Sequence, residues 1–166
     1  MKNLFVLISI MVFFFNTVAA REEYREESID NDYSNEIKEL ASKEKNLVLF
    51  FHQSGCPYCD KMRSRVHPSP MVVDYFNINF VMMDSNIKGN LEITMPDGTK
   101  GTERDFAKKL RIRATPVYIF YNREGKQALR ITGYFDEKSF FYAGKYVVEE
   151  MYNTKKSFFR YLQEQR

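Results

Sequence analysis

The apolar positions of this chain form runs that predict alternating strands and helices. Residues 47–51 are an unbroken apolar run, typical of a strand buried on both faces, and residues 80–83 form a second run of this kind. Between them, Cys59, Met62 and Val66 recur at the spacing of one helix face. The order of strand, helix and strand predicts an α/β domain.

Helical patterns continue on both sides of this unit. Upstream, Ile37, Leu40 and Ala41 recur as they would on one face of a short helix. Downstream, the two prolines of residues 67–70 interrupt the central helix, and residues 71–76 resume it. The first half of the domain is therefore predicted to contain three helical segments and two strands.

The second half of the chain is predicted to contain two hairpins and a helical end. Residues 84–101 are rich in Asn, Gly, Lys and Thr, and the turn signal at residues 96–98 predicts an inserted hairpin. Residues 117–121 and 128–132 read as a second hairpin. After Gly133 the apolar spacing is helical to the end of the chain.

The N-terminus has the pattern of a secretory signal peptide. Lys2 precedes an apolar stretch over residues 4–15, and Val18-Ala19-Ala20 offers small residues before a charged stretch. The apolar stretch is shorter than the roughly 20 residues that a spanning helix needs. We therefore predict a cleaved signal peptide over residues 1–20 and no membrane insertion afterwards. The alternative is an uncleaved anchor, which would also place the domain outside the cytoplasm.

The rest of the chain divides into a charged segment and one domain. Residues 21–32 carry many charges and few apolar side chains, which predicts a solvated linker. Residues 33–166 are enough for one domain with its own core, in which residues 153–166 form a C-terminal helical extension. The net charge of +3 is near neutral and does not indicate a nucleic acid or a membrane surface as partner.

The two cysteines of the chain lie three residues apart, in the sequence Cys56-Pro57-Tyr58-Cys59, at the start of the predicted central helix. A helix start presents unpaired N–H groups and the positive end of the helix dipole, which favour a cysteine thiolate. A thiolate attacks disulfides, and a second cysteine resolves the mixed disulfide. A bridge closing so short a loop would constrain the unfolded chain little, so the pattern predicts a reactive pair.

Three further side chains near the motif bear on its chemistry. His52, four residues before Cys56, would lower the pKa of that thiol if it were protonated and close. The alternative is a partly buried histidine that ends the strand. Lys61 and Arg63 are predicted to be solvated, on the helix face that points away from Cys59.

Two other uses of the cysteines are open. His52, Cys56, Cys59 and His67 form a possible Cys2His2 set for zinc or copper(I), but their spacing matches no zinc pattern, so we predict no metal and no cofactor. In a non-catalytic binding module the cysteines would be incidental. Inert cysteines are usually buried in apolar surroundings, whereas this pair is predicted to start a helix.

The order of predicted elements over residues 33–152 resembles that of the thioredoxin superfamily: strand, Cys-x-x-Cys helix, strand, helix, Thr115-Pro116, hairpin, Gly133 and terminal helix. The Cys-Pro-Tyr-Cys motif is similar to that of glutaredoxins. The export signal, the insertion over residues 84–101 and the aromatic ending resemble the periplasmic thioredoxin-related proteins of the SoxW type. This resemblance implies a thioredoxin-like fold, with a central mixed β-sheet flanked by helices, and a periplasmic location.

The resemblance also implies roles for single residues. Cys56 matches the exposed nucleophile of the family, and Cys59 matches its buried resolving thiol. Pro116 matches the proline whose peptide bond is cis and which faces the disulfide, and Thr115 would present backbone polar groups to a bound peptide. The substrate-binding residues implied in this way are Pro57, Tyr58, Thr115 and Pro116.

The sequence departs from the thioredoxin pattern at two positions. Many thioredoxins bury an acidic residue on the strand before the motif, where this chain has Phe50. The proton acceptor for Cys59 is therefore not identified by the resemblance. Thioredoxins also commonly have tryptophan before the first cysteine, where this chain has Gly55. We expect a more open surface around Cys56, with Tyr58 as its aromatic contact.

These observations predict an exported thiol-disulfide oxidoreductase that reduces disulfides in partner proteins. A disulfide oxidase or isomerase of the same fold is the alternative. The periplasm has no reducing buffer, so the resemblance implies a membrane thiol protein as electron donor. We expect a monomer.

Overall fold

A mixed sheet of four strands forms the centre of the computed structural model, which describes residues 22–165. β1 (Asn46–His52) pairs in parallel with β2 (Phe80–Asn86) and antiparallel with β5 (Val117–Tyr121). β5 also pairs antiparallel with β6 (Gln127–Thr132). The order β2-β1-β5-β6 places β1 in the interior of the sheet, as its unbroken apolar run predicts.

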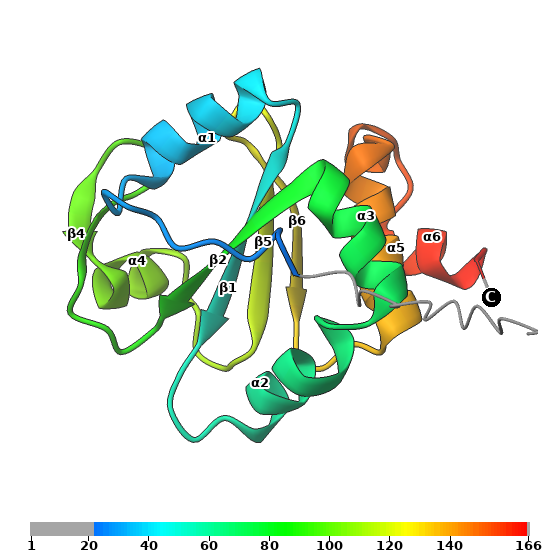
Figure 1. Cartoon of the computed structure of the whole chain (residues 1–166), viewed down its shortest axis with the longest axis horizontal. Coiled ribbons are helices and arrows are strands. Elements are labelled where there is room, and N and C mark those ends of the chain that lie inside the picture. Colours follow the sequence, from blue (N-terminus) through cyan, green and yellow to red (C-terminus); the bar gives the residue numbers. More distant parts are fainter. Residues whose placement is uncertain (1–21, 166) are drawn as a thin grey trace, which may run out of the picture.

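Helices cover both faces of this sheet. In Figure 1, α1 (Tyr33–Ser42) and α4 (Glu103–Lys109) lie on one side of it, and α3 (Pro70–Asn79) and α5 (Glu137–Val148) on the other. α2 (Pro57–Lys61) lies at the end of the sheet. The remaining elements are the π-helical segment η1 (Met62–Val66), β3 (Glu92–Thr94), β4 (Lys100–Thr102), the 3-10 helix η2 (Met151–Asn153) and α6 (Phe158–Gln163).

Successive side chains along the strands point to opposite faces of the sheet and pack into two separate hydrophobic cores. Val48 and Phe50 of β1 pack with residues of α2, η1, α3 and α5, while Leu49 and Phe51 pack against α1 and α4. All four side chains are fully buried. Covering both faces explains why β1 is apolar at consecutive positions and not at alternate ones. The fold is the thioredoxin-like α/β fold that the sequence predicts.

The approach of α3 to α5 depends on a small residue. A Cβ atom placed on Gly144 would lie 2.8 Å from Cε2 of Phe76 and 3.3 Å from the ring of Phe80. Phe76 stacks on Phe140 of α5, with ring centroids 5.0 Å apart. The aromatic layer under the sheet can therefore close only because position 144 carries no side chain.

The segment before α1 is not a solvated linker throughout. Residues 22–27, here called the N-terminal strap, run along the free edge of β2, where the backbone of Met82 pairs with Tyr24 and Glu26. Tyr24 is fully buried and its hydroxyl donates a hydrogen bond to the carbonyl oxygen of His67, 2.9 Å away. The prediction for residues 21–32 is therefore wrong at the strap, because one aromatic anchor and an open strand edge outweigh its charged composition.

The inserted hairpin and the helical end agree with their predicted places. β3 and β4 form the hairpin, and Thr102 and Asp105 form a capping box at the start of α4. In the extension 153–166, Phe158, Tyr161 and Leu162 of α6 are buried against the domain. The predicted signal peptide, residues 1–20, lies outside the described residues.

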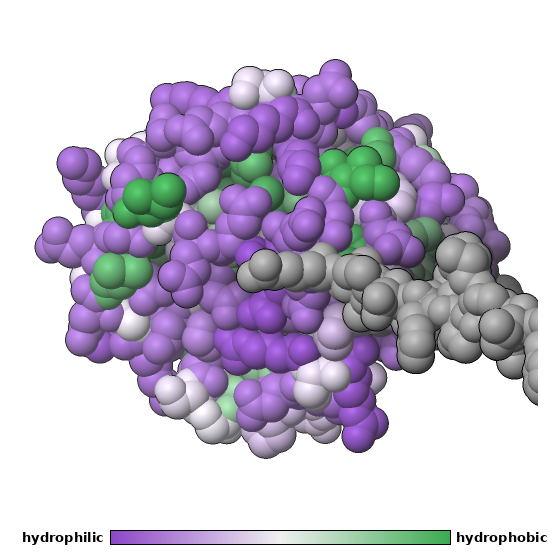
Figure 2. Space-filling model, in the orientation of Figure 1, coloured by the Kyte–Doolittle hydropathy of each residue, from purple (hydrophilic) through white to green (hydrophobic). Residues whose placement is uncertain are grey.

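The surface carries no broad apolar area on the face shown in Figure 2, where apolar side chains form small, separate areas within a hydrophilic surface. Within residues 22–165, no helix has both the length and the apolar character needed to cross a membrane.

Candidate functional site

The fold places the first cysteine at the start of a helix. β1 ends at His52, the chain turns at Gly55, whose φ is +68°, and Cys56 is the N-cap of α2. The Sγ atom of Cys56 accepts a hydrogen bond from the backbone N–H of Cys59, 3.2 Å away. Pro57 occupies the first helical turn, where its missing N–H removes no helix bond.

Cys56 and Cys59 are joined in a disulfide, with their sulfur atoms 2.06 Å apart. Cys59 is fully buried, as predicted, whereas Cys56 keeps 5% of its surface exposed. The expectation of an openly exposed nucleophile is therefore wrong in degree, although Cys56 is the more accessible of the two. A partner thiolate approaching from solvent meets Cys56 first.

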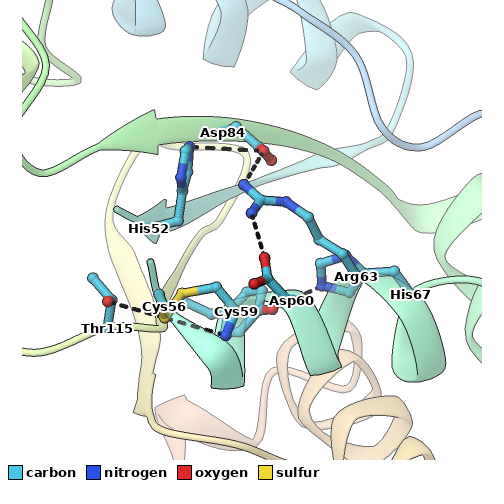
Figure 3. The surroundings of a disulfide bond; sticks show 9 residues. His52, Cys56, Cys59, Asp60, Arg63, His67, Asp84 and Thr115 are labelled. Carbon is cyan, nitrogen blue, oxygen red and sulfur yellow. Dashed lines mark hydrogen bonds and ion pairs between the residues drawn. A yellow bond between two sulfur atoms is a disulfide. The ribbon is translucent and has the colours of Figure 1, made fainter. Parts of the chain in front are cut away.

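The segment before β5 covers the disulfide from the opposite side. The Thr115–Pro116 peptide bond is cis, as the resemblance implied. The Thr115 hydroxyl donates a hydrogen bond to Sγ of Cys56 over 3.2 Å (Figure 3). This contact reduces the exposure of Cys56, so the expectation of an open surface holds beside Gly55, where no atom lies within 4 Å of an added Cβ, but not at Cys56 itself. Thr115 contributes its side chain to the site in addition to the backbone groups expected from the resemblance.

The other wall of the site is aromatic. The Tyr58 side chain is 59% exposed, and its ring centroid lies 6.4 Å from that of Tyr134, which follows β6. The ammonium of Lys61 lies over the Tyr134 ring, 4.0 Å from its centroid. A role of Pro57 and Tyr58 in substrate binding stays a prediction, but Tyr58 is available to a partner.

Phe50 occupies the buried position where many thioredoxins have an acid. It is fully buried, stacks on Tyr118 with centroids 4.8 Å apart, and meets the edge of His67 at 5.3 Å. The Arg63 guanidinium lies over the same ring, 4.8 Å from its centroid. The interior beside the motif therefore contains an aromatic stack and a cation.

Arg63 is not a solvated side chain on a remote face. Its guanidinium donates to Oδ2 of Asp84 over 2.8 Å and lies 4.0 Å from Asp60 (Figure 3). The prediction is wrong because Arg63 follows Cys59 by four residues, which places the two side chains on the same side of a helix, and because Asp84 of β2 lies within reach of the guanidinium. Arg63 thereby links the motif helix to β2.

His52 belongs to this ion-pair cluster. Its Nε2 atom lies 3.9 Å from Oδ2 of Asp84 (Figure 3). Burial lowers the pKa of His52, the positive charge of Arg63 lowers it further, and Asp84 acts in the opposite direction. A histidine with a lowered pKa is mainly neutral at pH 7, so it supplies little positive charge to Cys56. Its role as a modulator of that thiol stays a prediction.

The four residues of the alternative metal set are not brought together. His67 is fully buried, and its Nε2 atom lies 2.7 Å from the hydroxyl of Tyr118. His52 faces Asp84, and the two cysteines are bonded to each other. Across residues 22–165, no group of three or more histidine, cysteine or carboxylate side chains is arranged to hold a metal ion.

Buried His67 predicts a loss of stability in mild acid. Burial and the positive charges of Arg25 and Arg63 lower the pKa of His67 to about 3, against about 6.5 in an unfolded chain. Below pH 6.5 the unfolded chain binds the extra proton, so the free energy of unfolding falls as the pH falls. Between pH 6.5 and pH 5, this residue should lower it by about 1.5 kcal/mol.

Urea unfolding at pH 6.5 and pH 5 gives the loss of unfolding free energy for the protein and for a His67→Gln variant. Both contain the same other titrating groups, so the difference between the two losses measures the effect of His67. Equal losses in both proteins would contradict the assignment.

Three residues of the site could not be identified from the Cys-x-x-Cys motif. Asp84 and Tyr118 stand beside Phe50 because the registers of β2 and β5 with β1 place them there. Tyr134 reaches Tyr58 from the segment after β6. Only Asp84, the first polar residue after the apolar run of residues 80–83, could have been suspected from the sequence pattern.

Comparisons with known proteins support this description. Residues 33–147 match the sequence profile of the family described as a thioredoxin-like domain. No curated protein matches the chain in sequence.

Solved structures show the same fold at low identity. A thioredoxin-fold protein from Helicobacter pylori is 16% identical, with a TM-score of 0.64, and the match covers 88% of each chain. For a putative disulphide-isomerase from Bacteroides thetaiotaomicron the identity is 23% and the TM-score 0.57, over 75% of this chain and 91% of that one. A thioredoxin from Thermus thermophilus is 21% identical, with a TM-score of 0.55, and the match covers 70% of this chain and 84% of that one. With its Cys-x-x-Cys pair at disulfide distance, the chain belongs to the thioredoxin-like domain family.

Proposed function

We propose that this protein is an exported thiol-disulfide oxidoreductase that reduces disulfides in partner proteins. The observation that carries the proposal is the Cys56–Cys59 disulfide at the start of α2, in which Cys56 alone keeps some exposure. The Thr115 hydroxyl and the N–H of Cys59 both reach Sγ of Cys56. In the reduced protein, hydrogen bonds of this kind favour the thiolate, which is the attacking form.

The reaction transfers two electrons from the protein dithiol to the partner. The Cys56 thiolate attacks one sulfur of the partner disulfide, forms a mixed disulfide and releases the first partner thiolate. The Cys59 thiol then loses its proton and attacks Sγ of Cys56. This step restores the Cys56–Cys59 disulfide and releases the second partner thiolate. A dithiol donor must reduce the protein again before the next cycle, and we propose a membrane thiol protein for this role.

The reduction potential of the Cys56–Cys59 pair tests the direction of the reaction. Glutaredoxin-type pairs lie near −200 to −230 mV and thioredoxin near −270 mV, whereas a strong oxidant of this fold lies near −120 mV. We expect a value within the range of the two reductants, measured by equilibration with glutathione redox buffers. A value near −120 mV would contradict the reductase proposal and favour the alternative, a disulfide oxidase or isomerase.

The proposed location rests on the sequence, and the proposed assembly rests on the make-up of the site. The signal pattern of residues 1–20 supports export, and the resemblance to SoxW-type proteins supports the periplasm. We propose a monomer, since one chain contributes both cysteines and the cis-proline segment that faces them. Cleavage after Ala20 would give a mature chain that starts at Arg21, which N-terminal sequencing of the exported protein checks directly.

A further inference from the structure

The charges around the disulfide are unevenly balanced. Arg111 and Arg113 are exposed in the segment that leads to Thr115, and within residues 22–165 neither guanidinium is paired with a carboxylate. The neighbouring acids face two other cations, because Asp84 lies within ion-pair distance of both Arg25 and Arg63, and Asp60 lies 4.0 Å from Arg63. The rim of the site therefore has an excess of positive charge.

Arg113 is close to the reacting sulfur by chain connectivity. It precedes Thr115 by two residues, so their Cα atoms are at most about 7 Å apart. The Thr115 hydroxyl lies 3.2 Å from Sγ of Cys56. An acidic side chain beside a partner cysteine bound at Cys56 would thus be within reach of the Arg113 guanidinium.

The opposite wall adds a second cation to an aromatic surface. Tyr58 and Tyr134 form what we call the aromatic ledge, and the Lys61 ammonium lies over Tyr134. No atom comes within 4 Å of the place where a side chain on Gly55 would start, so the space before Cys56 is open. The ledge therefore offers apolar contact area beside the positive charge of Lys61, and Arg113 adds a second exposed cation in the segment that leads to Thr115.

We propose that the partner segment recognised by this site is acidic, carries its cystine next to Asp or Glu residues, and packs an apolar side chain on the aromatic ledge. The proposal rests on the proposed function and specifies its substrate class. Complementary charge chiefly accelerates encounter, so the preference should appear in the rate of reaction and weaken with salt.

Two disulfide-bonded peptides that differ only in their flanking residues, Glu in one and Lys in the other, test the preference. The dithiol form of the protein should reduce the Glu peptide about tenfold faster at low salt, and the ratio should shrink as salt approaches about 0.15 M. The variant Arg113→Gln should lower this ratio severalfold. The matched control is Arg123→Gln, an equal charge loss in the turn at the far end of β5.

The outcomes distinguish the preference for acidic peptides from the disulfide reductase activity itself. Equal rates for the two peptides, or an equal change of the ratio in Arg113→Gln and Arg123→Gln, would overturn the acidic preference while leaving the reductase proposal intact. A third peptide with neutral flanks monitors the activity itself. If none of the three is reduced, the proposed function fails, and the substrate preference that rests on it fails as well.

Discussion

Replacement of Cys59 by serine is expected to stop the reaction halfway and trap partner proteins on Cys56. The Cys56 thiolate can still attack a partner disulfide, because it is at the helix start and keeps its contact with Thr115. Release of the partner requires the buried sulfur of Cys59, which the variant lacks. Non-reducing gel electrophoresis of Cys59→Ser incubated with a disulfide substrate should show a covalent complex. Dithiothreitol should separate this complex by reducing the mixed disulfide.

The matched variant Cys56→Ser should form no such complex and lose at least about 1000-fold in the rate of disulfide reduction, because the nucleophile itself is missing. The opposite pattern, with complexes formed through Cys59 alone, would contradict the assignment of roles. Retention of the rate in Cys56→Ser would exclude the thiol mechanism altogether.

The sequence predicts the framework of this site because its signals are local. The apolar runs, the capping box and the turn residues each act over a few neighbouring positions, and the observed strands and hairpins follow them. The spacing of Cys59, Met62 and Val66 likewise predicts which side chains turn inward, and all three are fully buried. Burial of the resolving cysteine is thus encoded within one short helical segment.

The surroundings of the disulfide could not be predicted in the same way. Arg63 meets Asp84 across a distance of 21 residues in sequence, and that contact depends on the register of β2 with β1. The exposure of Cys56 depends on a hydroxyl 59 residues away, at Thr115. Such features follow from tertiary packing between residues far apart in sequence, which the spacing of apolar residues along the chain does not reveal.

Phe50 illustrates how a single departure from a family pattern changes the site. In its place an acid would lie beneath the motif, whereas here an aromatic ring is covered by the Arg63 guanidinium. Asp84 lies beside Phe50 on the neighbouring strand β2, and its carboxylate is held by Arg63. A phenyl ring takes up no proton, so position 50 supplies no proton acceptor for the Cys59 thiol.

The N-terminal strap offers the sharpest test of how this fold is held together. Tyr24→Ala is expected to lower the free energy of unfolding by about 3–5 kcal/mol, the usual range for deleting a fully buried aromatic ring. The ring packs against Phe76, with centroids 5.4 Å apart, and the hydroxyl reaches the carbonyl of His67. Urea unfolding of both proteins measures the loss from the shift of the midpoint.

Tyr24→Phe separates the two contributions, because it keeps the ring and removes only the hydrogen bond to His67. It should cost about 1 kcal/mol. In Tyr24→Ala, the amide of Met82 should also exchange with solvent faster, since it donates to the backbone carbonyl of Tyr24. If both variants unfolded at the same urea concentration as the parent, residues 22–27 would be a solvated linker after all. The edge of β2 at Met82 would then be open to a partner strand, because the strap is what pairs with the backbone there.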